Sequence, residues 1–272
     1  MEQNTFTNTQ QPVTPQNEEQ TYQFPTEEVT LPSKGLLYPE GHPLRSGVIR
    51  MKYMTAREED ILTNQNYIKN GTVINKLLQS LIVTPCDYND LLIGDKNSLL
   101  IAARILGYGS DYTFSFRDPS TGEEEEVTVD LTELDDKELD ESLMKDGKNE
   151  FEFQLPHSKI PITFKMLTHG DEEKITKELK GLKKINKFTS AELTTRLKHM
   201  ILSVNGDYEK KTIREFVDNA LLARDSKSLR NYLSEIMPDI DLKVDLDFSS
   251  GATAEGVSIP LGLNFFWPDA DI

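Results

Sequence analysis

Side chains that could do chemistry are present in this sequence, but their spacing matches no catalytic or metal-binding pattern. His42, His157, His169 and His199 lie far apart and outside any zinc-protease frame. Cys86 is the only cysteine, so one chain can form neither an intrachain disulfide nor a thiolate metal cluster. Phosphate-binding glycine loops and nucleophile elbows are missing too. We therefore predict no enzyme activity, no metal, no cofactor and no small-molecule substrate.

Alternating carboxylates in the segment DIDLKVDLD, residues 239–247, offer the oxygen ligands that a hard cation prefers. On a strand, Asp239, Asp241, Asp245 and Asp247 share one face. A calcium-binding loop also needs a tight glycine turn and a distal glutamate, and neither is in register here. The favoured interpretation is an outward polar face, opposite the apolar residues that alternate with these aspartates.

A lysine-rich helix is predicted within residues 169–187, in a chain that is otherwise acidic. Lys180, Lys183 and Lys184 are our candidate partner-binding residues on it. One interpretation is an ordinary amphipathic helix with lysines outward. The other is a basic stripe that binds the acidic edge of a neighbouring chain. The run Glu123–Glu126 has the same two interpretations, a solvated edge or an electrostatic docking edge.

The C-terminal segment IPLGLNFFWPD gathers large aromatic side chains where a chain end normally frays. Phe265, Phe266 and Trp267 are therefore further candidate partner-binding residues, because aromatic side chains dominate interface hot spots. The alternative is that they pack on the core of the second half of the chain.

Composition limits the class of protein. The chain has 272 residues, 37% of them hydrophobic, and a formal net charge of −16. This charge opposes general affinity for nucleic acid, whose phosphates require lysine and arginine. No apolar run approaches the ~18–20 residues that span a bilayer, so no membrane contact is expected. Residues 1–27 are polar and predicted to form a disordered tail.

The order of motifs repeats along the chain, which indicates two similar halves. The segments VTLPSKG, MKYMTAREED and LLIGDKNSL are followed later by FQLPHSK, FKMLTHGDEE and LLARDSKSL. Each half then closes on a predicted hairpin, at residues 113–131 and 244–261. We predict an α+β fold of two duplicated lobes, each with short strands, a helical cluster and a terminal β-hairpin. The lobes are residues 28–134 and 149–272, joined by an acidic linker at 135–148.

Local signals place the helices that hold these motifs. Thr55 is the expected N-cap of a helix, with Glu58 at the capping-box position, and Thr168 is its counterpart in the second half. Asp95 is expected to cap the next long helix of the first half. A helix is also predicted over residues 189–204.

The motifs LPSKGLLYP, IRMKYMTAREEDIL, LLIGDKNSLLIAARILGYGSDY and IPLGLNFFWPD together resemble the T-even-type bacteriophage baseplate hub protein family, over residues 28–269. The resemblance implies a structural or assembly role, within the infected bacterial cell or the virion, and other hub or tail proteins as partners. It also implies hairpins like small zinc ribbons. Here Arg117–Ser120 and Asp247–Ser250 occupy the cysteine positions without cysteine, so the ribbons are degenerate.

The sequence is compatible with two functions. The first is a non-enzymatic structural or assembly protein, chaperone-like in action, for the central hub of a contractile-tail baseplate. The alternative is a nucleic-acid-associated adaptor that uses the ribbon-like hairpins and the lysine-rich helix. The lysine-rich helix lacks interleaved aromatic residues, and this counts against the alternative.

Overall fold

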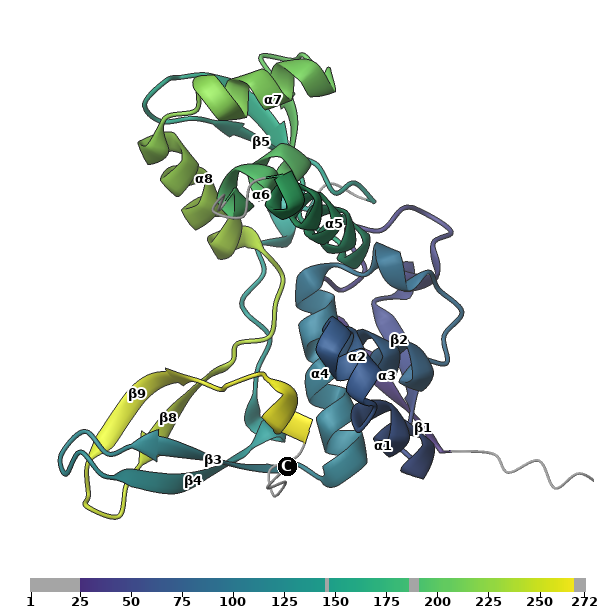
Figure 1. Ribbon diagram of the computed structural model, residues 1–272, viewed down its shortest axis with the longest axis vertical. Coiled ribbons are helices and arrows are strands. Elements are labelled where there is room, and N and C mark those ends of the chain that lie inside the picture. Colours follow the sequence, from purple (N-terminus) through teal and green to yellow (C-terminus); the bar gives the residue numbers. More distant parts are fainter. Residues whose placement is uncertain (1–24, 145–146, 186–190, 267–272) are drawn as a thin grey trace, which may run out of the picture.

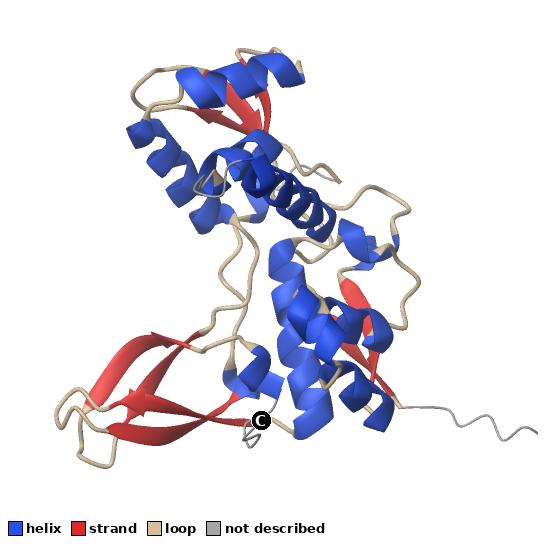
Figure 2. Cartoon of the chain, in the orientation of Figure 1, coloured by secondary structure: helices blue, strands red, loops and turns tan. Residues whose placement is uncertain are grey.

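The computed structural model describes residues 25–144, 147–185 and 191–266. The predicted α+β fold is confirmed, with small antiparallel sheets and many helices. Figure 2 shows the strands gathered at three places, so the chain divides into three bodies joined by loops. Two bodies combine strands with helices, and the third consists mainly of two hairpins (Figure 1).

The first body is built from the N-terminal half of the described chain (Figure 1). Its elements are β1 (Thr26–Thr30), β2 (Val48–Lys52), α1 (Ala56–Leu62), α2 (Gln65–Asn70), α3 (Val73–Leu81) and α4 (Ile93–Tyr108), with short 3-10 helices η1 (Pro43–Ser46) and η2 (Tyr88–Asp90). Helix α3 buries Val73, Leu77, Leu78 and Leu81, the spacing of one helical face. Thr55 precedes α1 as its N-cap and Glu58 completes a capping box, so that prediction is confirmed.

The second body is a three-stranded sheet with helices (Figure 1). Its elements are β5 (Phe151–Gln154), β6 (Pro161–Phe164), β7 (Ile201–Val204), α5 (His169–Ile185), α6 (Glu192–Met200), α7 (Lys210–Asn219) and α8 (Ala223–Ile236). The sheet order is β5-β6-β7, and both pairs are antiparallel.

The third body brings together hairpins from the two halves of the chain. These are β3 (Asp111–Arg117) with β4 (Glu124–Asp130), and β8 (Lys243–Asp247) with β9 (Thr253–Ser258). Val127, Leu246 and Phe248 form a small core between them, separate from the main hydrophobic core. The short helix η5 (Leu263–Phe266) follows and packs on α4. The two hairpins thus share a small core of their own, while Tyr112 of β3 belongs to the main core.

Two extended connectors link the second body to the hairpins (Figure 1). One includes Asp135–Lys137 from the predicted acidic linker, and the other includes Asp239–Asp241. They run beside each other through the antiparallel bridge between Asp136 and Ile240. The short 3-10 helices η3 (Leu131–Glu133) and η4 (Glu141–Leu143) lie on the first connector.

Two local predictions are wrong. The helix predicted over residues 189–204 ends at Met200, and Ile201–Val204 form strand β7. Pairing of β7 with β6 decides this, because Ile201 and Val204 are buried there and β-branched side chains fit a sheet well. Asp95 does not cap α4: the N-cap is Leu92, and Asp95 sits in the first turn. The carboxylate of Asp95 instead binds a distant loop.

The order of elements is similar in the two halves, although strand β7 has only an isolated bridge as its counterpart in the first half, and several contacts recur. In the first half Met51 of β2 forms a bridge with Ile82, just after α3. In the second half Phe164 of β6 pairs with Ile201, just after α6. Duplication itself stays a prediction, but the recurring contacts define the positions where functional side chains are compared below.

Candidate functional site

The first recurring site is a buried carboxylate in the first turn of a helix. In the first half, Glu58 accepts hydrogen bonds from the Thr55 N–H (3.0 Å), the Lys52 Nζ (2.8 Å) and the Ser80 hydroxyl (2.7 Å). Burial opposes ionisation of Glu58, but these hydrogen bonds outweigh it and lower its pKa to about 2. The ionised carboxylate therefore ties β2, α1 and α3 together.

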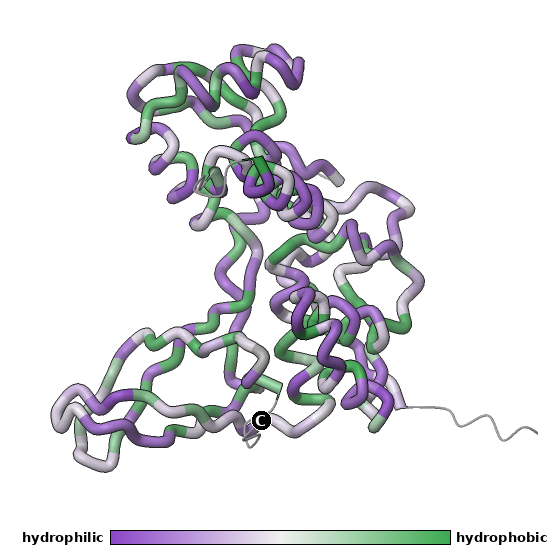
Figure 3. The backbone as a smooth tube through the Cα atoms, viewed as in Figure 1, coloured by the Kyte–Doolittle hydropathy of each residue, from purple (hydrophilic) through white to green (hydrophobic). Residues whose placement is uncertain are grey.

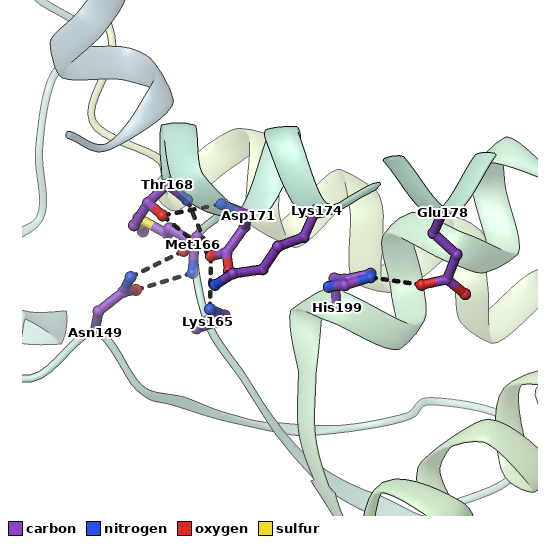
Figure 4. A network of polar contacts seen from close by, with 8 residues as sticks. All are labelled: Asn149, Lys165, Met166, Thr168, Asp171, Lys174, Glu178 and His199. Carbon is purple, nitrogen blue, oxygen red and sulfur yellow. Dashed lines mark hydrogen bonds and ion pairs between the residues drawn. The ribbon is translucent and has the colours of Figure 1, made fainter. Parts of the chain in front are cut away.

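The second half repeats this arrangement with aspartate (Figure 4). Asp171 accepts from the Lys165 Nζ (2.6 Å) and the Thr168 N–H (3.2 Å). Burial of Asp171 opposes ionisation, but its contacts with Lys165 and Thr168 lower its pKa overall. Asn149 adds a clamp on the neighbouring strand end, since its amide donates to the Met166 carbonyl and accepts from the Met166 N–H, both at 2.9 Å. Because Thr168 also accepts from the Asp171 N–H (3.3 Å), the side chain caps α5 as predicted.

A second recurring site holds the loop after the first strand of each half. Asp95 accepts from the Ser33 N–H (2.9 Å), the Ser33 hydroxyl (2.8 Å) and the Tyr38 hydroxyl (2.6 Å). Asp225 accepts from the His157 N–H (2.8 Å) and the Ser158 N–H (2.9 Å). Both aspartates are fully buried in the first turn of a helix, α4 or α8. The repeated motifs LLIGDKNSL and LLARDSKSL thus supply one loop-binding carboxylate each.

The two aspartates differ in electrostatics. Burial raises the pKa of Asp95 and outweighs its hydrogen bonds. For Asp225 burial acts in the same direction, but hydrogen bonds from His157 and Ser158 outweigh it and lower the pKa. Sequence reasoning missed the loop-binding role of both residues, although the repeat contained the signal.

The turns of the two hairpins meet at their tips, where the resemblance placed degenerate metal ligands. The Ser120 hydroxyl donates to the Ser250 hydroxyl at 3.1 Å. Glu125 accepts from the Ser249 N–H (2.9 Å) and hydroxyl (2.8 Å). Part of the predicted acidic run Glu123–Glu126 therefore joins the hairpins. Neutral and charge-assisted hydrogen bonds hold this contact.

The aspartates within residues 239–247 make different contacts from one another. Asp239 is buried and accepts from Asn97 at 3.0 Å, while Asp245 accepts from the Gly256 N–H at 2.8 Å. Asp241 and Asp245, with Asp130, Glu133 and Asp135, line a hollow of about 390 Å³ between β4 and β8. Across the described ranges, no three His, Cys, Asp or Glu residues are grouped so that they could hold a metal ion.

The structure separates the two groups of candidate partner-binding residues. Phe265 and Phe266 are both 1% exposed, and Phe265 packs edge-to-face on Tyr112 at 4.9 Å. Arg104 also donates to the Phe265 carbonyl at 3.0 Å. The aromatic pair therefore contacts β3 and α4 of the first half, and the alternative of packing on the second half's own core is wrong. A partner could contact Phe265 and Phe266 only after η5 leaves α4, and Trp267 lies outside the described residues.

The candidate lysines, unlike Phe265 and Phe266, are exposed. Lys180, Lys183 and Lys184 are exposed on α5, and this helix is coloured mostly hydrophilic in Figure 3. Ile185 at the end of α5 is 86% exposed. A partner-binding role for these lysines stays a prediction, and the structure keeps their side chains accessible.

A model of the T4 bacteriophage base plate protein family matches residues 25–267. No curated protein and no solved structure matches the chain significantly. Within the described part of the chain, no helix is long and apolar enough to cross a membrane. Because the family match spans nearly all of the sequence, the chain belongs to the T4 bacteriophage base plate protein family.

Proposed function

We propose that this chain is a non-enzymatic structural or assembly protein for the central hub of a contractile-tail phage baseplate. Family membership supports a structural or assembly role in a phage baseplate, in the virion or the infected cell. The observation that carries the proposal further is the use of the buried carboxylates. Glu58, Asp95, Asp171 and Asp225 each bind backbone N–H groups and so hold loops and helix ends in place. These carboxylates therefore stabilise the fold, as expected of a structural or assembly protein.

The partners proposed are other hub or tail proteins, bound in part through the lysines of α5. Lys180, Lys183 and Lys184 form an exposed cationic surface on a chain of net charge −16. Such a surface attracts the carboxylates of an acidic partner. Charge reversal of the three lysines is therefore expected to weaken partner binding, most strongly at low salt. If this variant binds baseplate proteins as tightly as wild type does, the three lysines do not contribute to the interface.

The hub role is tested by removing the gene for this chain from its phage and counting completed baseplates in infected cells. We expect baseplates without hubs, restored by a plasmid copy of the chain. Complete hubs in its absence would contradict the proposal. Mass spectrometry of purified virions then separates a permanent subunit from a transient, chaperone-like factor. The strong negative charge and the polar N-terminal residues favour a transient factor. Peptides of this chain at stoichiometric abundance in purified virions would exclude a transient factor.

The alternative function is a nucleic-acid-associated adaptor, and the exposed lysines on α5 are the observation that favours it. Phosphate contacts made by lysines weaken steeply with salt. Retention on DNA at low ionic strength that is lost on charge reversal of Lys180, Lys183 and Lys184 would favour this adaptor. Absence of retention at low salt would exclude it.

A further inference from the structure

An apolar groove is lined by residues from the start of α4 and from helices α5 and α6 and the end of α8. Figure 1 shows where these helices lie, at the place where the first and second bodies meet. Leu193, Leu197 and Met200 project into it from one face of α6, at the spacing that aligns side chains along a helix. Leu233 lines it from α8, Met237 from the residue that follows α8, and Ile93 from α4. Leu193 is 44% exposed, so the groove opens to the surface there.

Charged side chains at the groove are arranged unevenly. Glu172 and Arg196 form a forked pair, with Arg196 Nη2 donating to Glu172 Oε2 at 2.9 Å and Nη1 donating to Oε1. Arg230 on α8 also lines the groove and is exposed, and its guanidinium has no ion pair with any residue that the structure describes. One cation beside an apolar surface is therefore available to a carboxylate from outside.

The size of the groove indicates what it accepts. Its volume is about 250 Å³, below the ~300–1,000 Å³ typical of sites that enclose a small molecule. Space of this size suits one or two large side chains of a protein segment. Methionines such as Met200 and Met237 adapt their shape to such a segment.

We propose that this groove docks an amphipathic helix of another baseplate protein, which inserts a large apolar side chain and places a carboxylate beside Arg230. The proposal rests on the proposed function, since it names the partner chemistry of a baseplate assembly protein. A second copy of this chain fits less well, because two chains of net charge −16 repel each other at long range. Docking of a helix face in a groove is an established mode of protein recognition.

The chemistry of the groove is tested first with the full chain and the fluorescent probe anilinonaphthalene sulfonate, which combines an apolar ring system with an anion. Leu193→Glu and Arg230→Glu should each weaken probe binding roughly tenfold, because each removes one half of the match. Leu222→Glu and Arg224→Glu are matched controls at exposed positions beside the start of α8, outside the groove. Circular dichroism should show the same melting temperature for all four variants. Equal binding by wild type and both groove variants would overturn the proposal.

The partner is tested in infected cells that rely on a plasmid copy of the chain. The groove variants should lower the yield of infectious particles at least roughly tenfold, while both controls restore it. If the chain proves dispensable, the proposed function fails. If the chain is required but Leu193→Glu and Arg230→Glu restore full yield, only the groove inference is overturned.

The occupant is identified with a photocrosslinking amino acid, benzoylphenylalanine, in place of Leu193. We expect crosslinks to a helical segment of another baseplate protein, with a carboxylate three or four residues from a large apolar side chain. The added substitution Arg230→Glu should reduce those crosslinks. Crosslinks to peptides of this chain would assign the groove to a second copy or to its own termini, and would overturn the proposal.

Discussion

Arg104 donates a hydrogen bond from its Nε to the carbonyl oxygen of Phe265 at 3.0 Å, although the two residues lie 161 positions apart. The same buried guanidinium donates to the carbonyls of Gly109 (3.0 Å) and Asp111 (3.1 Å). One side chain of α4 therefore fastens the start of the first hairpin and the helix that follows the second one. This contact explains why η5 packs on the first half of the chain.

We predict that Arg104→Lys lowers the free energy of unfolding by roughly 2–4 kcal/mol, because lysine cannot reproduce the planar fork of donors. Urea denaturation measures the loss. Arg224→Lys, at an exposed position on α8, is the control and should change stability by less than about 0.5 kcal/mol. An Arg104→Lys protein as stable as wild type would show that the guanidinium does not fasten η5.

We predict that Glu58→Gln destabilises the protein by about 2–3 kcal/mol at pH 7, because Lys52 loses its charged partner. The pKa of Glu58 is lowered from 4.5 to about 2, so its contribution is fully present above about pH 4.5. That contribution is lost as the pH falls towards 2. Urea denaturation at a series of pH values should show a smaller acid loss for Glu58→Gln than for wild type. Glu59→Gln, at the next and exposed position, should behave as wild type.

His169 of α5 lies at the contact between the first and second bodies. Its ring packs edge-to-face on Tyr88 at 4.5 Å, and its backbone N–H donates to the Leu91 carbonyl at 2.8 Å. Burial lowers the pKa of His169, and Lys96 on α4 acts in the same direction, while Glu172 and Glu173 on α5 oppose them. The neutral ring is therefore the form that the folded protein prefers.

We predict that His169 contributes stability above about pH 6.5, the pKa of an unfolded histidine, and that this contribution falls below it. NMR titration of the imidazole should give a midpoint below 6.5. His169→Phe retains an aromatic ring beside Tyr88 and should remove this part of the pH dependence. A midpoint above 6.5, or an unchanged stability profile in His169→Phe, would contradict the prediction.

Gly94 lies where the second connector crosses the start of α4. A Cβ atom at this position would lie 1.8 Å from the Pro238 carbonyl oxygen, so the backbone would have to move. We predict that Gly94→Ala destabilises the protein by about 1–3 kcal/mol. Gly181 on α5 has open space around it, and Gly181→Ala should stabilise the helix by about 0.5–1 kcal/mol. Thermal unfolding of the two variants should therefore shift in opposite directions.

Short-range chemistry was predictable from the sequence. Thr55 and Glu58 lie three residues apart, so a capping box between them requires only the local helix. The hairpin turn at Asp118–Gly122 is local in the same way, since Gly122 has a φ of 73° and Asp118 accepts from the Ser120 N–H. The repeated motifs contain both loop-binding aspartates, but from the sequence alone Asp95 was assigned to a helix cap and Asp225 was given no role.

Long-range pairing was not predictable from one sequence. The sequence alone predicted that Ile201–Val204 continue a helix, because it does not show that β6 lies beside them as a partner strand. Asp95 meets Ser33 across 62 residues, and Ser120 meets Ser250 across 130. No periodic pattern specifies which distant segment a side chain will contact, because that choice depends on the packing of the whole chain.

The sequence by itself determined the class of elements, the repeated order of motifs and the membership of a baseplate family. Local propensity, capping and hydrophobic spacing are properties of neighbouring residues, and they are therefore written in the sequence directly. Only the tertiary structure decided that the two hairpins pack on each other and that Phe265 and Phe266 are buried against α4. It also formed the groove beside Arg230, because residues of α4 and of the helices α5, α6 and α8 line that groove together.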